Sequence, residues 1–298
     1  MAQEKQLEKS IIKTLCYADV FDYPLTSVEI WKWLIECNNA TIQQCDHELR
    51  KLKIVKSHIG YYFLNDKRNI TTIRQQRENW ARKKFKIAKT IASILKIIPS
   101  IKLIGLTGAL SMNNAKKDDD IDLFIISSSN LLWTTRLLAT LLIELIGKRR
   151  HPHHINVDNK ICLNMFIDED HLSQSQKERD LFSAHEILQM KPIYYKDQTY
   201  QIFLKNNLWV SQYLPNAFPK IYNYKLIMGK IEETLTFKIY FNLLKYFESF
   251  IKSIQLSYMA KRRTTEIISD GIIRFHPKDA RLWILKSYHE KLKLFNLI

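Results

Sequence analysis

The fold of this chain is decided by the stretch Leu106-Thr-Gly-Ala-Leu-Ser-Met-Asn-Asn-Ala-Lys-Lys-Asp-Asp-Asp-Ile-Asp-Leu-Phe-Ile-Ile126. The apolar run over residues 101–106 predicts one strand, and residues 121–126 predict a second. Asp120 and Asp122 open the second strand on either side of one apolar residue. Because side chains alternate along a strand, both carboxylates point to the same face, with Cα atoms roughly 7 Å apart. Two such charges repel each other unless a cation lies between them.

The residue types around this pair are those of a metal-assisted phosphoryl or nucleotidyl transfer. Carboxylate oxygens favour a hard cation such as Mg²⁺. Gly108 lets the backbone approach a ligand closely, and the short helix expected after it offers N–H groups to a phosphate. A metal beside a backbone turn that binds phosphate is typical of the sites that catalyse these reactions. The alternative is an acidic surface turn between two strands.

This order of strand, glycine turn, spacer and Asp-x-Asp strand resembles the nucleotidyltransferase superfamily of DNA polymerase beta, poly(A) polymerases and CCA-adding enzymes. Gly108 and Asp120 are twelve positions apart, which fits the spacing of that family. The resemblance implies that Asp120 and Asp122 hold Mg²⁺ or Mn²⁺. It also implies that a nucleoside triphosphate is the substrate, and that Gly108 and the backbone after it hold the phosphates.

The chain departs from the family pattern near its phosphate cradle. Ala109 stands where the family has Gly or Ser, so a hydroxyl is missing there, and Ser111 is the candidate to replace it. Many bacterial members carry Arg-Gly where this chain has Met112-Asn113. We expect Lys116 or Lys117 to supply the basic contact instead.

The family normally adds a third acidic residue from a later strand, which helps to hold the metal and accepts a proton. The next predicted strand covers residues 160–167, and the expected position falls on Asn164. Asparagine can ligate a metal through its carbonyl oxygen but cannot act as a base. Asp168 has the same parity and is the candidate substitute as metal ligand. An acidic start of a helix is the alternative reading of residues 168–170.

The composition of the 298 residues limits the class of protein. Forty-six basic against thirty acidic residues give a net charge of +16, which favours a polyanionic partner, most commonly nucleic acid. A codon bias toward Lys, Ile and Asn is the alternative explanation. We expect no membrane partner, no signal peptide and a cytoplasmic location, because no apolar run is long enough and the four cysteines lack paired spacing.

The predicted fold class is α+β, in four parts. Residues 1–66 read as three helices and a β-hairpin, which resembles a winged helix. Residues 67–99 read as one long basic helix, and residues 100–170 as the nucleotidyltransferase core with a small mixed sheet. Residues 171–298 read as mainly helical.

Basic side chains concentrate in the long helix, which suits contact with a phosphate backbone. A solvated helix face between two domains is the alternative. The segment contains ten cations: Lys67, Arg68, Arg74, Arg77, Arg82, Lys83, Lys84, Lys86, Lys89 and Lys96. Residues 261–263 and 274–278 are further candidate phosphate contacts.

These observations predict a template-independent nucleotidyltransferase whose acceptor is RNA, such as a tRNA end, in preference to DNA. A protein or small-molecule acceptor is the alternative within the same chemistry. A non-catalytic winged-helix regulator that senses a nucleotide is the alternative outside it. The sequence does not indicate the base, the number of nucleotides added or the oligomeric state.

Overall fold

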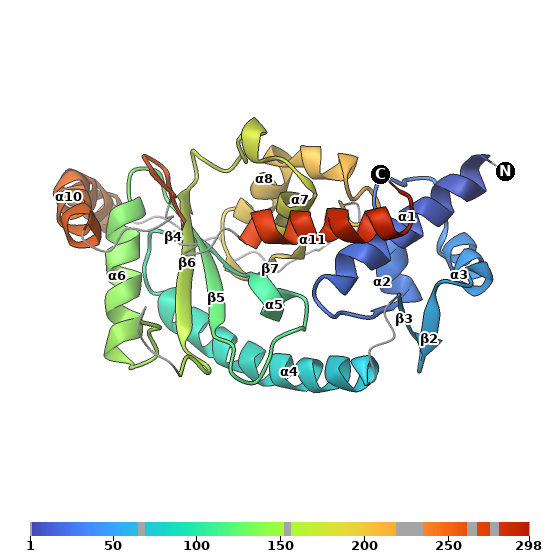
Figure 1. The fold of residues 1–298 in the computed structure, drawn as a ribbon. Coiled ribbons are helices and arrows are strands. Elements are labelled where there is room, and N and C mark those ends of the chain that lie inside the picture. Colours follow the sequence, from blue (N-terminus) through green and yellow to red (C-terminus); the bar gives the residue numbers. More distant parts are fainter. Residues whose placement is uncertain are drawn as a thin grey trace.

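The computed structural model describes residues 2–64, 69–151, 156–218, 235–260, 267–274 and 280–297. Within these ranges the chain is a mixed α+β protein with two sheets (Figure 1). The expected α+β class is therefore confirmed. None of the helices in these ranges combines the length and the apolar character needed to cross a membrane.

The N-terminal unit, residues 2–64, contains three helices and a small antiparallel sheet in the order β1-β3-β2. Thr26 and Thr41 each form a capping box with the residue three positions later, which fixes where two of the helices begin. The second helix is capped by Thr26 and ends at Lys32. The elements are α1 (Ala2–Asp19), β1 (Leu25–Thr26), α2 (Ser27–Lys32), α3 (Ile42–Lys51), β2 (Lys56–His58) and β3 (Tyr61–Phe63).

A long helix, α4 (Ile70–Leu95), connects this unit to the large sheet and runs beneath both in Figure 1. Its apolar positions, among them Ala81, Ala88 and Ile91, are buried against the sheet. The predicted long basic helix is thus present. Lys67 and Arg68 lie outside the described residues.

The large sheet is mixed and has the order β7-β4-β5-β6-β9-β8. Strands β5 and β6 are parallel, and the other pairs are antiparallel. The strands are β4 (Ile101–Leu106), β5 (Ile121–Ser127), β6 (Ile161–Asp168), β7 (Lys191–Tyr195), β8 (Ile267–Ser269) and β9 (Ile272–Arg274). Three of these described strands come from residues beyond 170, so the predicted boundary at 170 cuts through the sheet.

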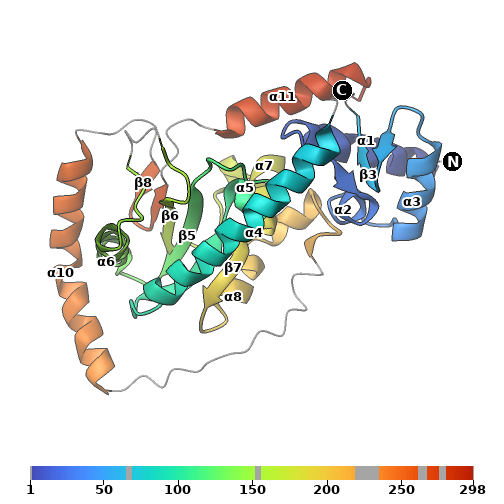
Figure 2. The ribbon, with the colours of Figure 1, turned by 90° about the horizontal axis from the view of Figure 1, so that it is seen from below.

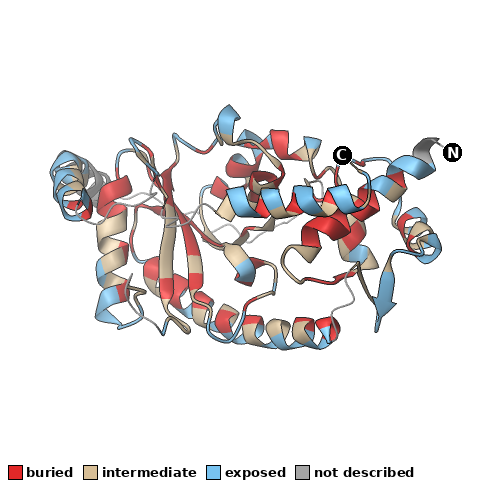
Figure 3. Cartoon of the chain, in the orientation of Figure 1, coloured by how far each residue is buried: buried red, intermediate tan, exposed pale blue. Residues whose placement is uncertain are grey.

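Helices cover both faces of this sheet (Figure 2). One face packs on α4, α6 (Leu132–Leu145) and α10 (Leu235–Ala260). The other packs on α7 (Leu181–Gln189) and α8 (Thr199–Asn206). The central strands are accordingly buried, whereas the outer helix faces are exposed (Figure 3).

The N-terminal unit shares a core with the second face of the sheet. Ile12 and Trp33 belong to the same buried cluster as Leu103 and Phe124. The last helix, α11 (Ala280–Leu294), contributes Tyr288 to this cluster and contacts both α1 and α7. The unit is therefore fixed beside the sheet through a continuous apolar core.

Candidate active site

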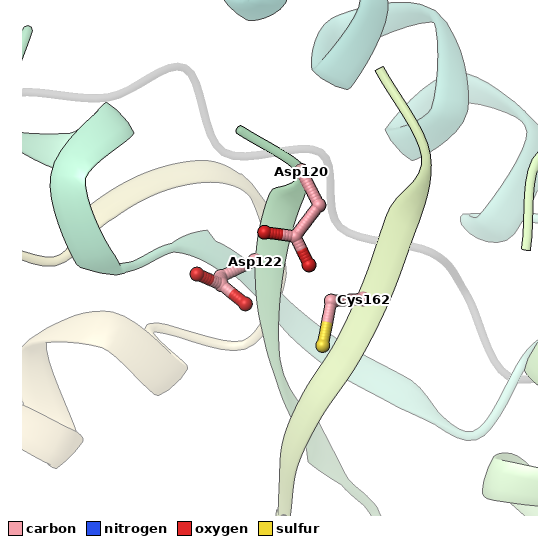
Figure 4. Close-up of side chains that lie close together, drawn as sticks. All are labelled: Asp120, Asp122 and Cys162. Carbon is pink, nitrogen blue, oxygen red and sulfur yellow. The ribbon is translucent and has the colours of Figure 1, made fainter. Parts of the chain in front are cut away.

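The carboxylate pair, Asp120 and Asp122, lies at the start of β5. The parallel register places Cys162 of β6 directly beside Asp122. One ligand atom from each of the three residues lies within 4.8 Å of the other two, and all three side chains are half-buried (Figure 4). The two carboxylates suit Mg²⁺ or Mn²⁺, whereas burial raises the pKa of the Cys162 thiol and makes its sulfur a poor ligand for these cations. The carboxylate pair fits a divalent cation.

Gly108 packs directly on Asp122. It opens the short helix α5 (Gly108–Ser111) with a φ of +63°, a conformation that glycine adopts without strain. A Cβ atom at this position would lie 2.8 Å from Oδ2 of Asp122. The backbone N–H of Thr107 also donates to the carbonyl oxygen of Asp122 at 3.2 Å. The turn after β4 and the carboxylate therefore fit together only with glycine at this position.

Burial and charge perturb Asp122. Burial against the wall of the site, followed by repulsion from Asp120, raises the pKa of Asp122 to about 7. Arg150 partly offsets this effect, because its Nη1 donates to Oδ2 of Asp120 at 2.7 Å and approaches Sγ of Cys162 at 3.6 Å. The net surplus of negative charge is what a bound cation would neutralise.

Arg150 and Cys162 were not expected from the sequence. Arg150 lies in a connection that has no periodicity, so no local pattern marked it. Cys162 could have been found by aligning two parallel strands from their first residues, since it occupies the position beside Asp122. That alignment requires knowing that the two strands pair, which is long-range information.

The two candidates for the third ligand lie in different places. Asn164 lines the same cavity as Asp122, at an irregularity in the pairing of β5 with β6. Asp168 pairs with Ser127 at the other end of β6, six residues beyond Cys162 and therefore about 20 Å away by strand rise. It is buried and hydrogen-bonded to Nδ1 of His171 at 2.6 Å. The prediction that Asp168 is a metal ligand of this site is therefore wrong.

The candidate phosphate contacts are only partly brought together. Ala109 lines the cavity beside Gly108. The Ser111 hydroxyl is buried and donates to the carbonyl oxygen of Gly108 at 2.8 Å, so it serves the helix turn. Lys116 and Lys117 lie on an exposed loop outside the cavity, and Nζ of Lys117 lies 5.7 Å from the Trp80 ring. Among the described residues that line this cavity, Arg150 is the cation that reaches the carboxylates.

The loop before the pair is anchored by Lys84. This residue is 1% exposed, and its Nζ donates to the carbonyl oxygens of Lys117 at 2.9 Å and Asp119 at 2.7 Å. It also donates to Oδ1 of Asp158 at 2.7 Å. A buried lysine is stable only with such partners. Because Lys84 belongs to α4, these hydrogen bonds fix the loop before Asp120 against that helix.

The central cavity, of about 390 Å³, extends from Asp122 to the N-terminal unit. Gly108, Asp122, Arg150 and Asn164 form its polar end. Aromatic side chains from α1, the α1–β1 connection, the C-cap of α2, α7 and α11 form much of the rest: Tyr17, Phe21, Tyr23, Trp33, Phe182 and Trp283. The volume and the apolar lining with few polar groups are typical of a small-ligand site.

The basic helix divides into inward and outward cations. Arg74, Arg77 and Lys84 turn inward; Arg74, for example, pairs with Glu29 at 2.7 Å. Arg82, Lys83, Lys86, Lys89 and Lys96 are the exposed cations among the described residues of this segment. We call these five residues the basic stripe. Residues 261–263 and 275–278 lie outside the described residues, and Arg274 pairs with Glu178 at 3.1 Å.

Comparisons of the chain with protein-family models, with curated proteins and with solved structures each found no match. The chemistry of the site therefore follows from its own geometry.

Proposed function

We propose that this protein is a metal-dependent nucleotidyltransferase. An acceptor hydroxyl oxygen would bond to the α-phosphorus of a nucleoside triphosphate, the bond to the β-phosphate would break, and pyrophosphate would leave. The observation that carries the proposal is the joint placement of Asp120, Asp122 and Gly108. A carboxylate pair with its glycine turn in direct contact is what the resemblance implies.

The residues of the chain would divide the work. Asp120 and Asp122 would hold the cation, which when bound neutralises phosphate charge and lowers the pKa of the acceptor hydroxyl. The backbone at Gly108 and Ala109 would receive the phosphates. Arg150, half-exposed beside Asp120, is placed to move from the carboxylate to a phosphate oxygen once the cation is present.

The architecture would be a winged-helix-like N-terminal domain followed by a nucleotidyltransferase core. On α3, Arg50 pairs with Asp46 at 2.8 Å and Lys51 with Glu48 at 2.8 Å, which leaves little unpaired charge for reading DNA. The basic stripe on α4 is the better candidate for a nucleic-acid backbone. It supports RNA, or else DNA, as the acceptor.

A small-molecule acceptor is favoured by a different observation, the central cavity with its largely apolar lining. A non-catalytic nucleotide sensor is favoured by Asn164 in place of an acid and by the Arg150–Asp120 ion pair. Retention of two half-buried carboxylates beside each other argues for catalysis, because such a cluster is costly without a cation.

The test is incubation of the protein with each α-labelled triphosphate, Mg²⁺ or Mn²⁺, and separate pools of RNA, DNA, protein and small metabolites. Label in the RNA pool is the expected result. Label in the protein or metabolite pool would instead identify a protein or a small molecule as the acceptor. Absence of label from every pool with both metals, together with intact nucleotide binding, would favour the sensor.

A further inference from the structure

A carboxylate on α7, Glu186, lies between the central cavity and a neighbouring cavity and lines both. It lines the central cavity together with Asp122, and its negative charge contributes to the raised pKa of Asp122. In the residues that the structure describes, no donor forms a hydrogen bond to its carboxylate. The cation whose charge acts on it, Arg274, pairs with Glu178. A half-buried carboxylate that lines a cavity and receives no internal hydrogen bond can accept hydrogen bonds from a ligand.

The cavity also offers an aromatic surface. Tyr17 stacks on His185 with ring centroids 4.1 Å apart, and the Arg74 guanidinium lies 3.8 Å from the centroid of Tyr23, so these two rings already have partners. Trp283 of α11 meets Phe21 edge-on at 6.4 Å and remains 50% exposed. A half-exposed indole at the mouth of a cavity is a stacking surface for a flat ring.

We propose that this cavity binds a guanine base, which stacks on Trp283 and donates its two adjacent N–H groups to the Glu186 carboxylate. The proposal rests on the nucleotidyl transfer proposed above, and it names GTP as the triphosphate. The phosphates of a nucleotide at Gly108 leave its base within the same cavity, because Gly108, Glu186 and Trp283 all line it.

The chemistry of the four bases selects guanine. An ionised carboxylate only accepts hydrogen bonds, and it has two oxygens side by side. Guanine presents N1–H and the N2 amino group next to each other. Adenine and cytosine place one amino group beside an acceptor nitrogen, and uracil places its N–H between two carbonyl oxygens. Each of these three bases therefore puts a lone pair against the carboxylate.

Binding of guanine would change the protonation of Glu186. Burial raises the pKa of its carboxyl group to about 7. Two N–H donors would stabilise the charged form and lower that pKa again.

The test measures binding of the four α,β-methylene triphosphate analogues with Mg²⁺, which requires no turnover. The wild-type protein should bind the guanosine analogue about 5- to 150-fold more tightly than the other three, the range of one bidentate pair. Glu186→Gln should lose most of this preference. Trp283→Leu should weaken all four analogues by similar factors. Glu290→Gln, an exposed glutamate on α11, is the control and should behave as wild type.

Glu186→Asp keeps both acceptor oxygens, so it should keep the order of preference at lower affinity even if Glu186→Gln folds poorly. Equal binding of the four analogues by the wild type, or a guanine preference that survives in Glu186→Gln, would overturn the proposal. Label transfer without a base preference would contradict only the proposed guanine subsite. A guanine preference without label transfer would contradict only the proposed nucleotidyltransferase activity.

Discussion

At the scale of single residues, Gly108 and Asp122 depend on each other. The glycine has a φ of +63° and would bring a Cβ to 2.8 Å from the carboxylate. Gly147 has the same φ, but open space surrounds its Cβ position. The chain thus offers two glycines with the same backbone φ, only one of which touches the site.

Gly108→Ala should therefore impair the metal site, whereas Gly147→Ala should leave it intact. Each substitution places alanine in the left-handed region, which costs about 1 to 2 kcal/mol. Only Gly108→Ala also displaces the Asp122 carboxylate, so only it should weaken divalent-cation binding, measured by isothermal titration. Equal cation affinity in the two variants would mean that the glycine contact does not set the metal site.

His185 predicts how stability depends on pH. Burial lowers its pKa to about 3, and its Nε2 has no hydrogen-bond partner among the described residues. Because the folded-state pKa lies below the unfolded value of about 6.5, the histidine destabilises the protein as pH falls below 6.5. The free energy of unfolding of wild type relative to His185→Phe should fall by about 1.4 kcal/mol per pH unit in that window.

Urea titrations at several pH values would measure this difference, and phenylalanine keeps the stacking on Tyr17. Glu186 changes stability in the opposite direction, because its folded pKa is raised. The comparison between the two proteins cancels that contribution. A difference that stays constant between pH 7 and pH 4 would show that His185 is hydrated in the folded state.

At the scale of elements, α4 and the loop before β5 act as one piece through Lys84. Lys84→Met would leave two carbonyl oxygens and the Asp158 carboxylate without their buried donor. We expect a loss of about 3 kcal/mol in the free energy of unfolding. Lys83→Met, one residue away and exposed, should stay within about 0.5 kcal/mol of wild type. Urea unfolding checks both, and a small effect at Lys84 would mean that the loop finds other donors.

The strands around the site could be predicted because their signals are local. Residues 101–106 match β4, and β5 and β6 begin within one residue of the predicted positions. Strands β8 and β9 have three residues each, too few for a period, and β7 contains Pro192. Their place in the sheet depends on pairing with distant strands. Arg150 and Cys162 could not be predicted for the same reason, because they lie beside the carboxylates only once β5 and β6 pair.

At the scale of the whole molecule, the charge of +16 is unevenly placed. Arg82, Lys86, Lys89 and Lys96 follow helical spacing and share one exposed face of α4. Since Lys84 is buried, a test of nucleic-acid binding has to neutralise the exposed positions alone.

Changing Arg82, Lys86 and Lys89 to Gln should weaken RNA binding and its dependence on salt. Each phosphate contact adds roughly 0.7 to 0.9 to the slope of log affinity against log salt, so the slope should drop by about two to three units. Triphosphate binding should not change. RNA and DNA affinities that stay flat between about 50 and 200 mM salt would remove nucleic acid as the partner.

The central claim is that Asp120 and Asp122 hold the cation that drives nucleotidyl transfer. The most direct measurement is the initial rate of label transfer from an α-labelled triphosphate by wild type, Asp120→Ala, Asp122→Ala and Asp118→Ala. The account predicts that the first two substitutions reduce the rate by several orders of magnitude, since the cation contributes several kcal/mol and each 1.4 kcal/mol is about tenfold. Asp118→Ala, an exposed acid in the same loop, should keep the wild-type rate. Near-wild-type transfer by both Asp120→Ala and Asp122→Ala, with folding verified by circular dichroism, would contradict the account.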